Sequence, residues 1–311
     1  MTLPTPFRFS QSNLQDYLDC RRRFQLRYLQ HLVWPAIQVE PAMEVERHTH
    51  LGALFHRLIQ QHLLGLPPDT LSRLAHQPEL SRWWSNYLAQ FASPAGVITW
   101  RGAIAPLQGA EHTADISIHH QAEATLLAPL EQHHLIAQYD VILSVLGEGA
   151  TNCTPSTRLV IFEWKTSLRR PKRHWLAQRV QTRLYPYVLV RAGSHLCNGQ
   201  AIAPEQVEMA YWFAEFPDQP ERFTYTQTQF EQDERFLTSL IKEIESLDEQ
   251  DFHLTEHVER CHFCVYRSLC ERGKSAADIT QAQDSEAQTA PSWETEIDFD
   301  LDFEQIAELE F

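Results

Sequence analysis

The sequence predicts an α/β fold, and three observations support that prediction. The chain has 311 residues, 43% of them hydrophobic, which is enough for one large domain with a substantial core or for two small ones. Apolar residues recur at helical spacing up to about residue 92. After residue 134, β-branched apolar runs alternate with helical ones. A chain of this pattern is expected to combine strands and helices.

The first predicted element is an amphipathic helix over residues 9–29 (FSQSNLQDYLDCRRRFQLRYL). Its apolar side chains recur every three or four residues. Ser12 and Gln15 have the spacing of a capping box at its start. Cys20 lies on this helix, one turn after Tyr17.

Two further helices are expected before the strands. Residues 48–65 (HTHLGALFHRLIQQHLLG) carry an apolar stripe with His56 beside it, and two prolines end this helix. A lone histidine in such a place is more often packed than a ligand. Residues 70–92 again have helical spacing.

Two apolar segments carry charges that a buried strand should not contain. Residues 134–143 (HLIAQYDVIL) and 158–165 (RLVIFEWK) are predicted strands, joined by a Gly-, Thr-, Ser- and Pro-rich loop as in an antiparallel hairpin. Alternation places Glu163 and Lys165 on one face, and Asp140 would approach them if the strands pair. Two close carboxylates favour a bound Mg²⁺ or Mn²⁺, whereas a structural Glu163–Lys165 ion pair explains the pattern equally well.

A basic stretch follows these strands and runs into the next predicted helix, residues 173–191. Gln181 and Tyr185 are four residues apart and share one face of that helix. Residues 165–183 contain seven basic side chains and no acidic one, as expected of a phosphate-binding patch. Besides Lys165 these are Arg169, Arg170, Lys172, Arg173, Arg179 and Arg183.

The last part of the body ends in clustered cysteines. A strand is predicted at 206–214 and a helix at 228–247. The segment CHFCVYRSLC follows, with the spacing C-x2-C-x5-C, which provides three of the four ligands that a metal site usually needs. Its cysteines are Cys261, Cys264 and Cys270. Cys153 and Cys197 fall in predicted loops and receive no role.

The net charge of −15 is concentrated at the C-terminus. Residues 275–311 hold 11 acidic and no basic residues, which leaves 30 of the 41 acidic residues against all 26 basic ones. We expect this acidic tail to be mostly disordered. No apolar stretch approaches the roughly 18 residues of a membrane span, and no signal peptide is recognised, so a soluble cytoplasmic protein is expected.

The ordered motifs resemble the iron–sulfur branch of the PD-(D/E)XK nucleases, which includes RecB-like and AddB-type nuclease domains and a CRISPR-associated exonuclease. The motifs are SQSNLQDYLDCRRRF, GALFH, QYD, EWK, QTRLY and the cysteine segment, together spanning residues 9–272. The resemblance implies a restriction-endonuclease-like core, a mixed central sheet flanked by helices, with an N-terminal helical region and a C-terminal iron–sulfur staple. Residues 1–274 would then form the nuclease domain.

The resemblance also implies roles for single residues. His56, Asp140 and Glu163 look like ligands of Mg²⁺ or Mn²⁺, and Lys165 like the residue that activates the attacking water. Gln181 and Tyr185 look like the auxiliary motif, and Glu123 matches an acidic residue that some relatives place upstream. The chain departs from the family in two places: the glycine of Gly-x-x-Asp is absent, and Pro186 follows the motif tyrosine.

For the cysteines, the resemblance implies that Cys20 joins Cys261, Cys264 and Cys270 around a 4Fe–4S cluster that staples the two ends of the domain. Closing so long a loop removes unfolded-state entropy. The spacing alone suits zinc as well.

The predicted function is therefore that of a metal-dependent DNA nuclease, an exonuclease on single-stranded or fraying ends, in repair and recombination or in CRISPR-type processing. The alternatives are a catalytically silent DNA-binding scaffold of a helicase–nuclease complex, or an iron–sulfur electron carrier or redox sensor. The chain has no phosphate-binding loop motif of a helicase, so any helicase or CRISPR partner would be a separate protein.

Overall fold

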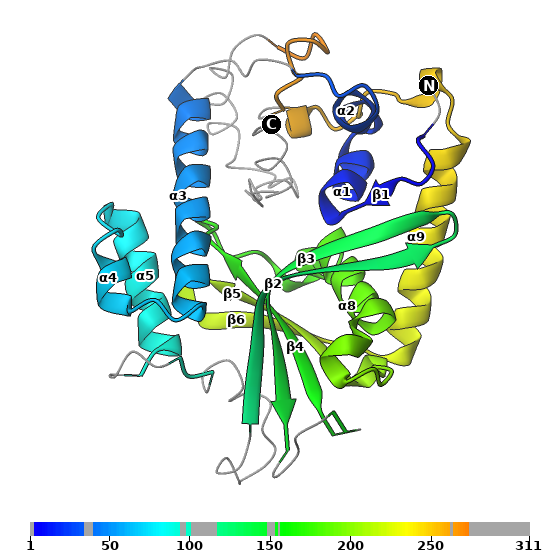
Figure 1. Cartoon of the computed structure of the whole chain (residues 1–311). Helices are drawn as coiled ribbons and strands as arrows, with labels where there is room; N and C mark the ends of the chain where they lie inside the picture. The colour runs from blue at the N-terminus through cyan, green and yellow to red at the C-terminus, as the bar shows by residue number, and fades with distance from the viewer. Residues whose placement is uncertain are drawn as a thin grey trace.

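The computed structural model describes residues 3–33, 40–93, 98–100, 117–147, 153–154, 156–261 and 264–273. It contains a six-stranded mixed sheet in the order β1-β3-β4-β5-β6, with β2 paired to β3 beside this path. Helices lie on both faces of the sheet (Figure 1). The predicted α/β fold with a mixed central sheet is therefore confirmed. The strands are β1 (Arg8–Phe9), β2 (Ser117–Leu130), β3 (His133–Leu146), β4 (Arg158–Lys165), β5 (Val207–Phe213) and β6 (Phe216–Thr224).

The sheet mixes both strand directions. β3 and β4 are antiparallel, as the hairpin prediction required, and β4 and β5 are parallel. β5 pairs antiparallel with β6, β2 antiparallel with β3, and β1 parallel with β3. The parallel β4–β5 pair needs a crossover, and the chain between the two strands supplies it with a helix, as parallel strands generally require.

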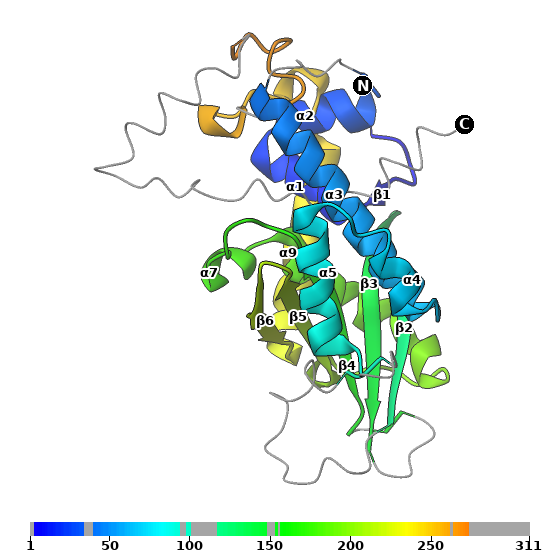
Figure 2. The ribbon, with the colours of Figure 1, turned by 90° about the vertical axis from the view of Figure 1, so that its left-hand side faces the viewer.

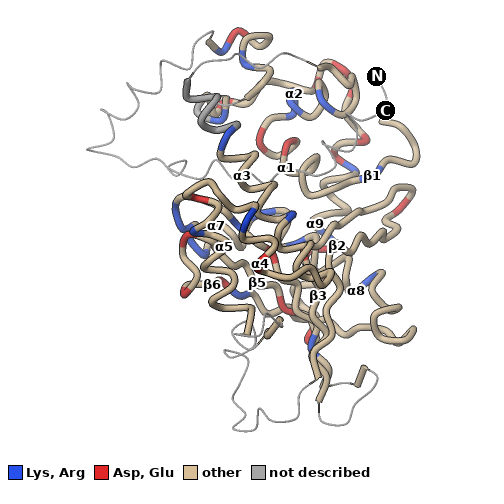
Figure 3. Tube along the Cα trace, turned by 60° about the vertical axis from the view of Figure 1, so that its left-hand side comes forward, with Lys and Arg blue, Asp and Glu red and all other residues tan. Residues whose placement is uncertain are grey.

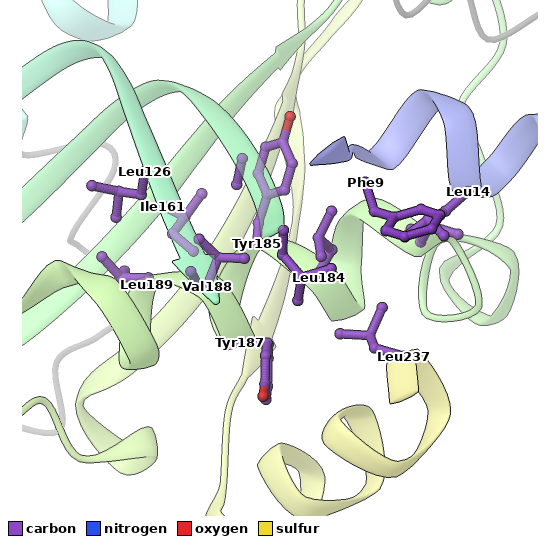
Figure 4. Packing of buried hydrophobic residues seen from close by; sticks show 14 of the residues in the cluster. Phe9, Leu14, Leu126, Ile161, Leu184, Tyr185, Tyr187, Val188, Leu189 and Leu237 are labelled. Atoms are coloured by element: carbon purple, nitrogen blue, oxygen red, sulfur yellow. The ribbon is translucent and has the colours of Figure 1, made fainter. Parts of the chain in front are cut away.

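The helices divide into two layers that cover opposite faces of the sheet (Figures 1 and 2). On one face, α3 and α5 bury an aromatic cluster that includes Trp83, Tyr87 and Phe91. On the other face, α1, α8 and α9 bury leucines and tyrosines against the sheet, and Figure 4 shows part of this packing. The helices are α1 (Gln11–Asp19), α2 (Arg21–Phe24), α3 (Glu40–Leu63), α4 (Pro68–Ser72), α5 (Pro78–Phe91), α7 (Arg173–Leu176), α8 (Val180–Ala192) and α9 (Gln227–Ser246).

The alternation of β4 assigns its side chains to these two layers. Val160, Phe162 and Trp164 belong to the aromatic cluster under α3 and α5. Ile161 belongs to the cluster under α8. Glu163 and Lys165 share the parity of Ile161, so they project toward the face that α8 covers, as the sequence predicted from alternation.

The prediction of a single helix over residues 9–29 is wrong, because the helix is interrupted at Cys20. Cys20 is extended, with φ −162° and ψ 107°, and it separates α1 from α2, which continues as a short π-helix, Gln25–Leu29. The capping box is also shifted by two residues: the Ser10 side chain accepts from the Asn13 amide, and the Asn13 side chain accepts from the Ser10 amide. The apolar side chains still recur at helical spacing across the break, because both helices pack on the same core.

Other boundaries differ where the chain turns. The helix expected at 70–92 is two helices, α4 and α5, and the one expected at 173–191 is α7 followed by α8. α8 continues through Pro186. β1, β2 and β6 were not predicted: β1 has two residues, half of β2 is exposed, and β6 is an edge strand with two prolines.

The structure also gives Cys153 and Cys197 a role that the sequence did not. They form a disulfide with an S–S distance of 2.08 Å, joining the chain before β4 to the 3-10 turn after α8. The acidic tail predicted at 275–311 lies outside the described residues. Of the helices in the described ranges, none has both the length and the apolar character needed to cross a membrane.

Candidate active site

The candidate site lies where β3 separates from β4. The pairing between these strands covers Val141–Val145 and Arg158–Phe162, and it stops just before Asp140 and Glu163. Beyond that point, side-chain carboxylates take the place of the backbone hydrogen bonds between the strands. The Trp164 amide donates to Asp140 Oδ2 at 2.8 Å, and the Asp140 amide donates to Glu163 Oε1 at 3.4 Å. Two backbone donors that the split would leave unpaired are therefore satisfied by two acidic side chains.

His56 joins this pair from α3. Its Nδ1 lies 3.1 Å from Asp140 Oδ1. Burial opposes the charged form of His56, but the charge and hydrogen bond of Asp140 outweigh burial and raise the His56 pKa above its ordinary value. α3 comes this close because it carries Gly52, where an added Cβ would lie 3.0 Å from Thr166 Oγ1. Packing of α3 against the end of β4 thus places the histidine.

Gln181 approaches Glu163 from the opposite side, on α8. Its Nε2 donates to Glu163 Oε2 at 2.8 Å, and both side chains are buried. Tyr185, one turn later, donates through its hydroxyl to Gln11 Oε1 on α1 at 3.2 Å. The Tyr185 carbonyl accepts from the hydroxyl of Tyr139 at 2.9 Å. Of the two residues of the predicted auxiliary motif, Gln181 therefore contacts the Glu163 carboxylate, and Tyr185 links α8 to α1 and to β3.

Lys165 completes the group at the end of β4. It is 7% exposed, and its positive charge opposes the protonation of His56. Its Nζ lies 5.7 Å from the centre of the Tyr211 ring on β5. Tyr211 was not predicted from the sequence, because its place depends on the pairing of β5 with β4.

Glu123 lies on β2 at the same level of the sheet. The β2–β3 pairing omits it between Ala122 and Ala124, and its φ of 52° is in the left-handed region. Burial, followed by the charge of Asp140, raises the Glu123 pKa to about 7. The acidic residue that the sequence matched upstream thus lies close enough to feel the charges of Asp140 and His56.

The family of this chain follows from its sequence as a whole. Residues 8–271 match the model of the PD-(D/E)XK nuclease superfamily. The chain belongs to the PD-(D/E)XK nuclease superfamily. Members of this superfamily are nucleases, and they usually use divalent metals such as Mg²⁺ or Mn²⁺.

No curated protein matches the chain in sequence. A solved structure of a proposed exonuclease from Eubacterium rectale is 9% identical, with 90% of this chain and 93% of that chain covered and a TM-score of 0.36.

The site of this PD-(D/E)XK chain has the donor types that Mg²⁺ and Mn²⁺ accept, two carboxylates and one imidazole. Within the ranges that the structure describes, however, no three His, Cys, Asp or Glu side chains are placed so that they could hold one metal ion. Three protein N–H groups point at the carboxylates instead, from the Trp164 amide, the Gln181 side chain and the Asp140 amide. The ligand types fit a divalent cation, while their oxygens are occupied by protein donors.

The basic stretch of this PD-(D/E)XK chain links the end of β4 to the start of α8 and includes α7. Figure 3 shows Lys and Arg positions in blue near α7. Arg169 and Lys172 are exposed. Arg170 and Arg173 are also exposed, and both bind Glu221 of β6, which anchors the segment. Arg179 stacks 4.6 Å over the Trp175 ring. Arg183 lies further along α8, and its Nε donates to the fully buried Asp233 of α9 at 2.6 Å.

The four cysteines that the resemblance grouped together line one small cavity between the N-terminal helices and the last described segment. Arg23 and Arg267 line it as well. Burial and, after it, the charges of the other three thiols raise the pKa of Cys270 to about 11. Burial also raises the pKa values of Cys261 and Cys264. The cavity thus brings Cys20 to the C-terminal trio, but the thiols are not spaced as a metal site.

Proposed function

We propose that this protein is a Mg²⁺- or Mn²⁺-dependent deoxyribonuclease that acts as an exonuclease on single-stranded or fraying DNA ends. The observation that carries the proposal is the gap between β3 and β4, where Asp140, Glu163 and His56 converge with Lys165. A buried Glu163 with a second carboxylate next to it is costly in a strand, and it is understandable where a cation and a phosphate bind. Membership of the nuclease superfamily supports the same conclusion.

The residues have separate tasks in this proposal. His56, Asp140 and Glu163 would hold a divalent cation, which would supply Lewis acidity and a water molecule of lowered pKa. Lys165 orients the attacking water and stabilises the negative charge that develops as the P–O3′ bond breaks. Gln181 fixes the orientation of Glu163 through its hydrogen bond.

DNA binding is assigned to the exposed basic stretch. The side chains that would contact phosphates are Arg169, Arg170, Lys172, Arg173 and Arg179, which lie beside the catalytic group. Contacts of this kind hold the backbone without selecting a base sequence. Arg183 would contribute through its charge on α8, although its guanidinium also serves the contact with α9.

For the cysteine cavity we propose a 4Fe–4S cluster bound by Cys20, Cys261, Cys264 and Cys270. The chemistry of the donors supports it, because the raised pKa values of Cys261, Cys264 and Cys270 mean that these thiols become thiolates readily only when a cation compensates them. Protein purified without oxygen should be brown and contain about four iron atoms per chain. A colourless protein with one zinc ion per chain would refute the cluster and retain the four-thiol site.

The nuclease proposal is tested with end-labelled oligonucleotides, single-stranded and duplex, with Mg²⁺ or Mn²⁺ and with a chelator. We expect metal-dependent release of nucleotides from an end, and no cutting of a circular single strand. Cleavage of the circle would show an endonuclease. Comparing 5′ and 3′ labels gives the polarity.

One observation favours a second candidate, a catalytically silent DNA-binding subunit that works with a separate helicase. Protein N–H groups occupy the carboxylate oxygens in this structure. Under this alternative the protein binds DNA through its basic stretch but cuts none with any divalent metal. Binding without cleavage in the oligonucleotide assay would therefore select the scaffold over the nuclease in repair or CRISPR-type processing.

A further inference from the structure

Tyr211 lies next to the proposed catalytic group although it belongs to a different strand. In the parallel pairing of β4 and β5, Tyr211 is the partner of Glu163, and Phe213 is the partner of Lys165. Residues paired in this way project from the same face of a sheet. The Tyr211 side chain is 1% exposed, so it lies in the interior beside Glu163 and Lys165.

The ring of Tyr211 contacts the lysine. Lys165 Nζ is 5.7 Å from the ring centre, within the range of a cation–π interaction. The negative face of an aromatic ring attracts an ammonium group, and this attraction grows when both groups are buried. Lys165 itself is 7% exposed. The ring therefore restricts where the ammonium can lie.

The hydroxyl of Tyr211 fixes the ring in turn. It lies 2.8 Å from Thr182 Oγ1 on α8. Thr182 has one hydroxyl proton, and it donates this proton to the Leu176 carbonyl at 2.6 Å. Tyr211 must therefore be the donor in the first bond. Thr182 follows Gln181, the residue that holds Glu163, so one short stretch of α8 orients both the carboxylate and the ring under the lysine.

We propose that Tyr211 is a positioning residue for Lys165, acting through its ring, with Thr182 as the residue that holds the ring in place. This inference rests on the proposed nuclease function. It predicts a loss of turnover without a loss of DNA binding, because the ring contacts the lysine and the exposed basic stretch is untouched. Tyr211→Leu should lower kcat about tenfold, equivalent to about 1.4 kcal/mol of transition-state stabilisation. KM and oligonucleotide affinity in a chelator should stay within twofold.

Two variants separate the ring from the hydroxyl. Tyr211→Phe keeps the ring, so most of kcat should be retained, and Thr182→Val should resemble Tyr211→Phe. Tyr225→Leu is the matched control, because Tyr225 is also buried and its hydroxyl binds Asp233 rather than the site. It should lower the melting temperature as Tyr211→Leu does while leaving kcat unchanged.

A graded substitution keeps the test valid even if Tyr211→Leu fails to fold. Phenylalanines with increasing numbers of ring fluorines, placed at position 211, preserve the shape and progressively weaken the negative face. We expect kcat to fall stepwise across this series at constant melting temperature. A flat series in a wild type that cuts DNA would overturn the positioning role alone. A wild type that never cuts DNA would overturn the proposed function together with it.

Discussion

Glu163 and Lys165 are only 3% and 7% exposed, and their burial sets what their substitution should do. Glu163→Gln keeps the size of the side chain and an acceptor for Gln181 but removes the negative charge. If the residue is catalytic, the variant should bind less metal and lose cleavage while its melting temperature changes little. If Glu163 forms only a structural ion pair with Lys165, the uncompensated lysine should cost about 3–5 kcal/mol of stability.

Glu208 offers the matched control for that measurement. It is also 3% exposed on the sheet, and it binds Arg158 and Arg222 in a structural ion-pair group. Glu208→Gln should therefore lower the melting temperature clearly and leave the cleavage rate of the folded protein unchanged. Loss of stability in both glutamine variants would identify Glu163 as structural.

Lys165→Ala should retain metal and DNA, because the ligands and the basic stretch remain. We expect cleavage to fall by about two orders of magnitude or more, which is typical of removing one electrostatic stabiliser from an active site. Oligonucleotide affinity in a chelator and single-turnover cleavage rates measure the two effects separately. A variant that cuts at the wild-type rate would exclude a catalytic lysine.

For single residues, the alternation of side chains within one strand predicted the site best. It predicted that Glu163 and Lys165 lie on the same face of their strand, and the predicted hairpin placed Asp140 next to Glu163. It could not give Tyr211 or Gln11, because their contacts arise from the parallel crossover and from α1 docking on α8. Such contacts depend on tertiary packing, which the spacing of apolar residues along the sequence does not predict.

Among the elements, α8 has an unusual start. Its N-cap residue, Arg179, provides no side-chain cap, and the Val180 amide donates instead to Gln15 Oε1 on α1 at 3.3 Å. Gln15→Ala should therefore destabilise the protein by about 1 kcal/mol, as the loss of a helix cap does. Hydrogen exchange of the Val180 amide should accelerate. Gln227→Ala, which removes an exposed glutamine at the start of α9, is the control. Unchanged protection of Val180 would contradict the capping role.

The helix predictions failed where a single residue with extended backbone interrupts a helix although the apolar side chains keep their helical spacing. Cys20 is extended between α1 and α2, yet the apolar side chains on both sides pack on one core. The sequence pattern therefore shows one helix where the structure has two. β2 was missed for a different reason: it reads SIHHQAEATLLAPL, and its exposed half lacks the apolar alternation that marks a strand.

For the whole molecule, Cys20→Ala tests whether the cysteine cavity holds the chain together. Cys20 and Cys270 are 250 residues apart in sequence and line the same cavity. A cluster closing such a loop would stabilise the protein by about 5 kcal/mol in the chain-entropy picture. We expect the variant to lose bound iron and much of this stability, measured by iron analysis and urea unfolding. Leu18→Ala, an exposed position nearby, should change neither.

The acidic segment 275–311, which we propose to be an appendage to the nuclease domain of residues 1–274, is tested by its removal. The deletion takes away 11 negative charges and no positive ones. If the segment competes with DNA for the basic stretch, the shortened protein should bind oligonucleotides more tightly, and added salt should reduce the difference. Equal affinity, with no partner lost, would leave the segment a solubilising role only.

The bond between Gln15 and Val180 has a consequence for how the protein is made. Its two ends are 165 residues apart, so at about 5–20 residues per second α8 leaves the ribosome on the order of 10–30 s after α1. During that interval Leu14 and Tyr17, which are buried in the finished protein, have no α8 to pack against. A nascent chain with this exposed apolar face is a target for chaperones, and the helix that carries Gln181 acquires its cap only by recruiting α1 from the opposite end of the polypeptide.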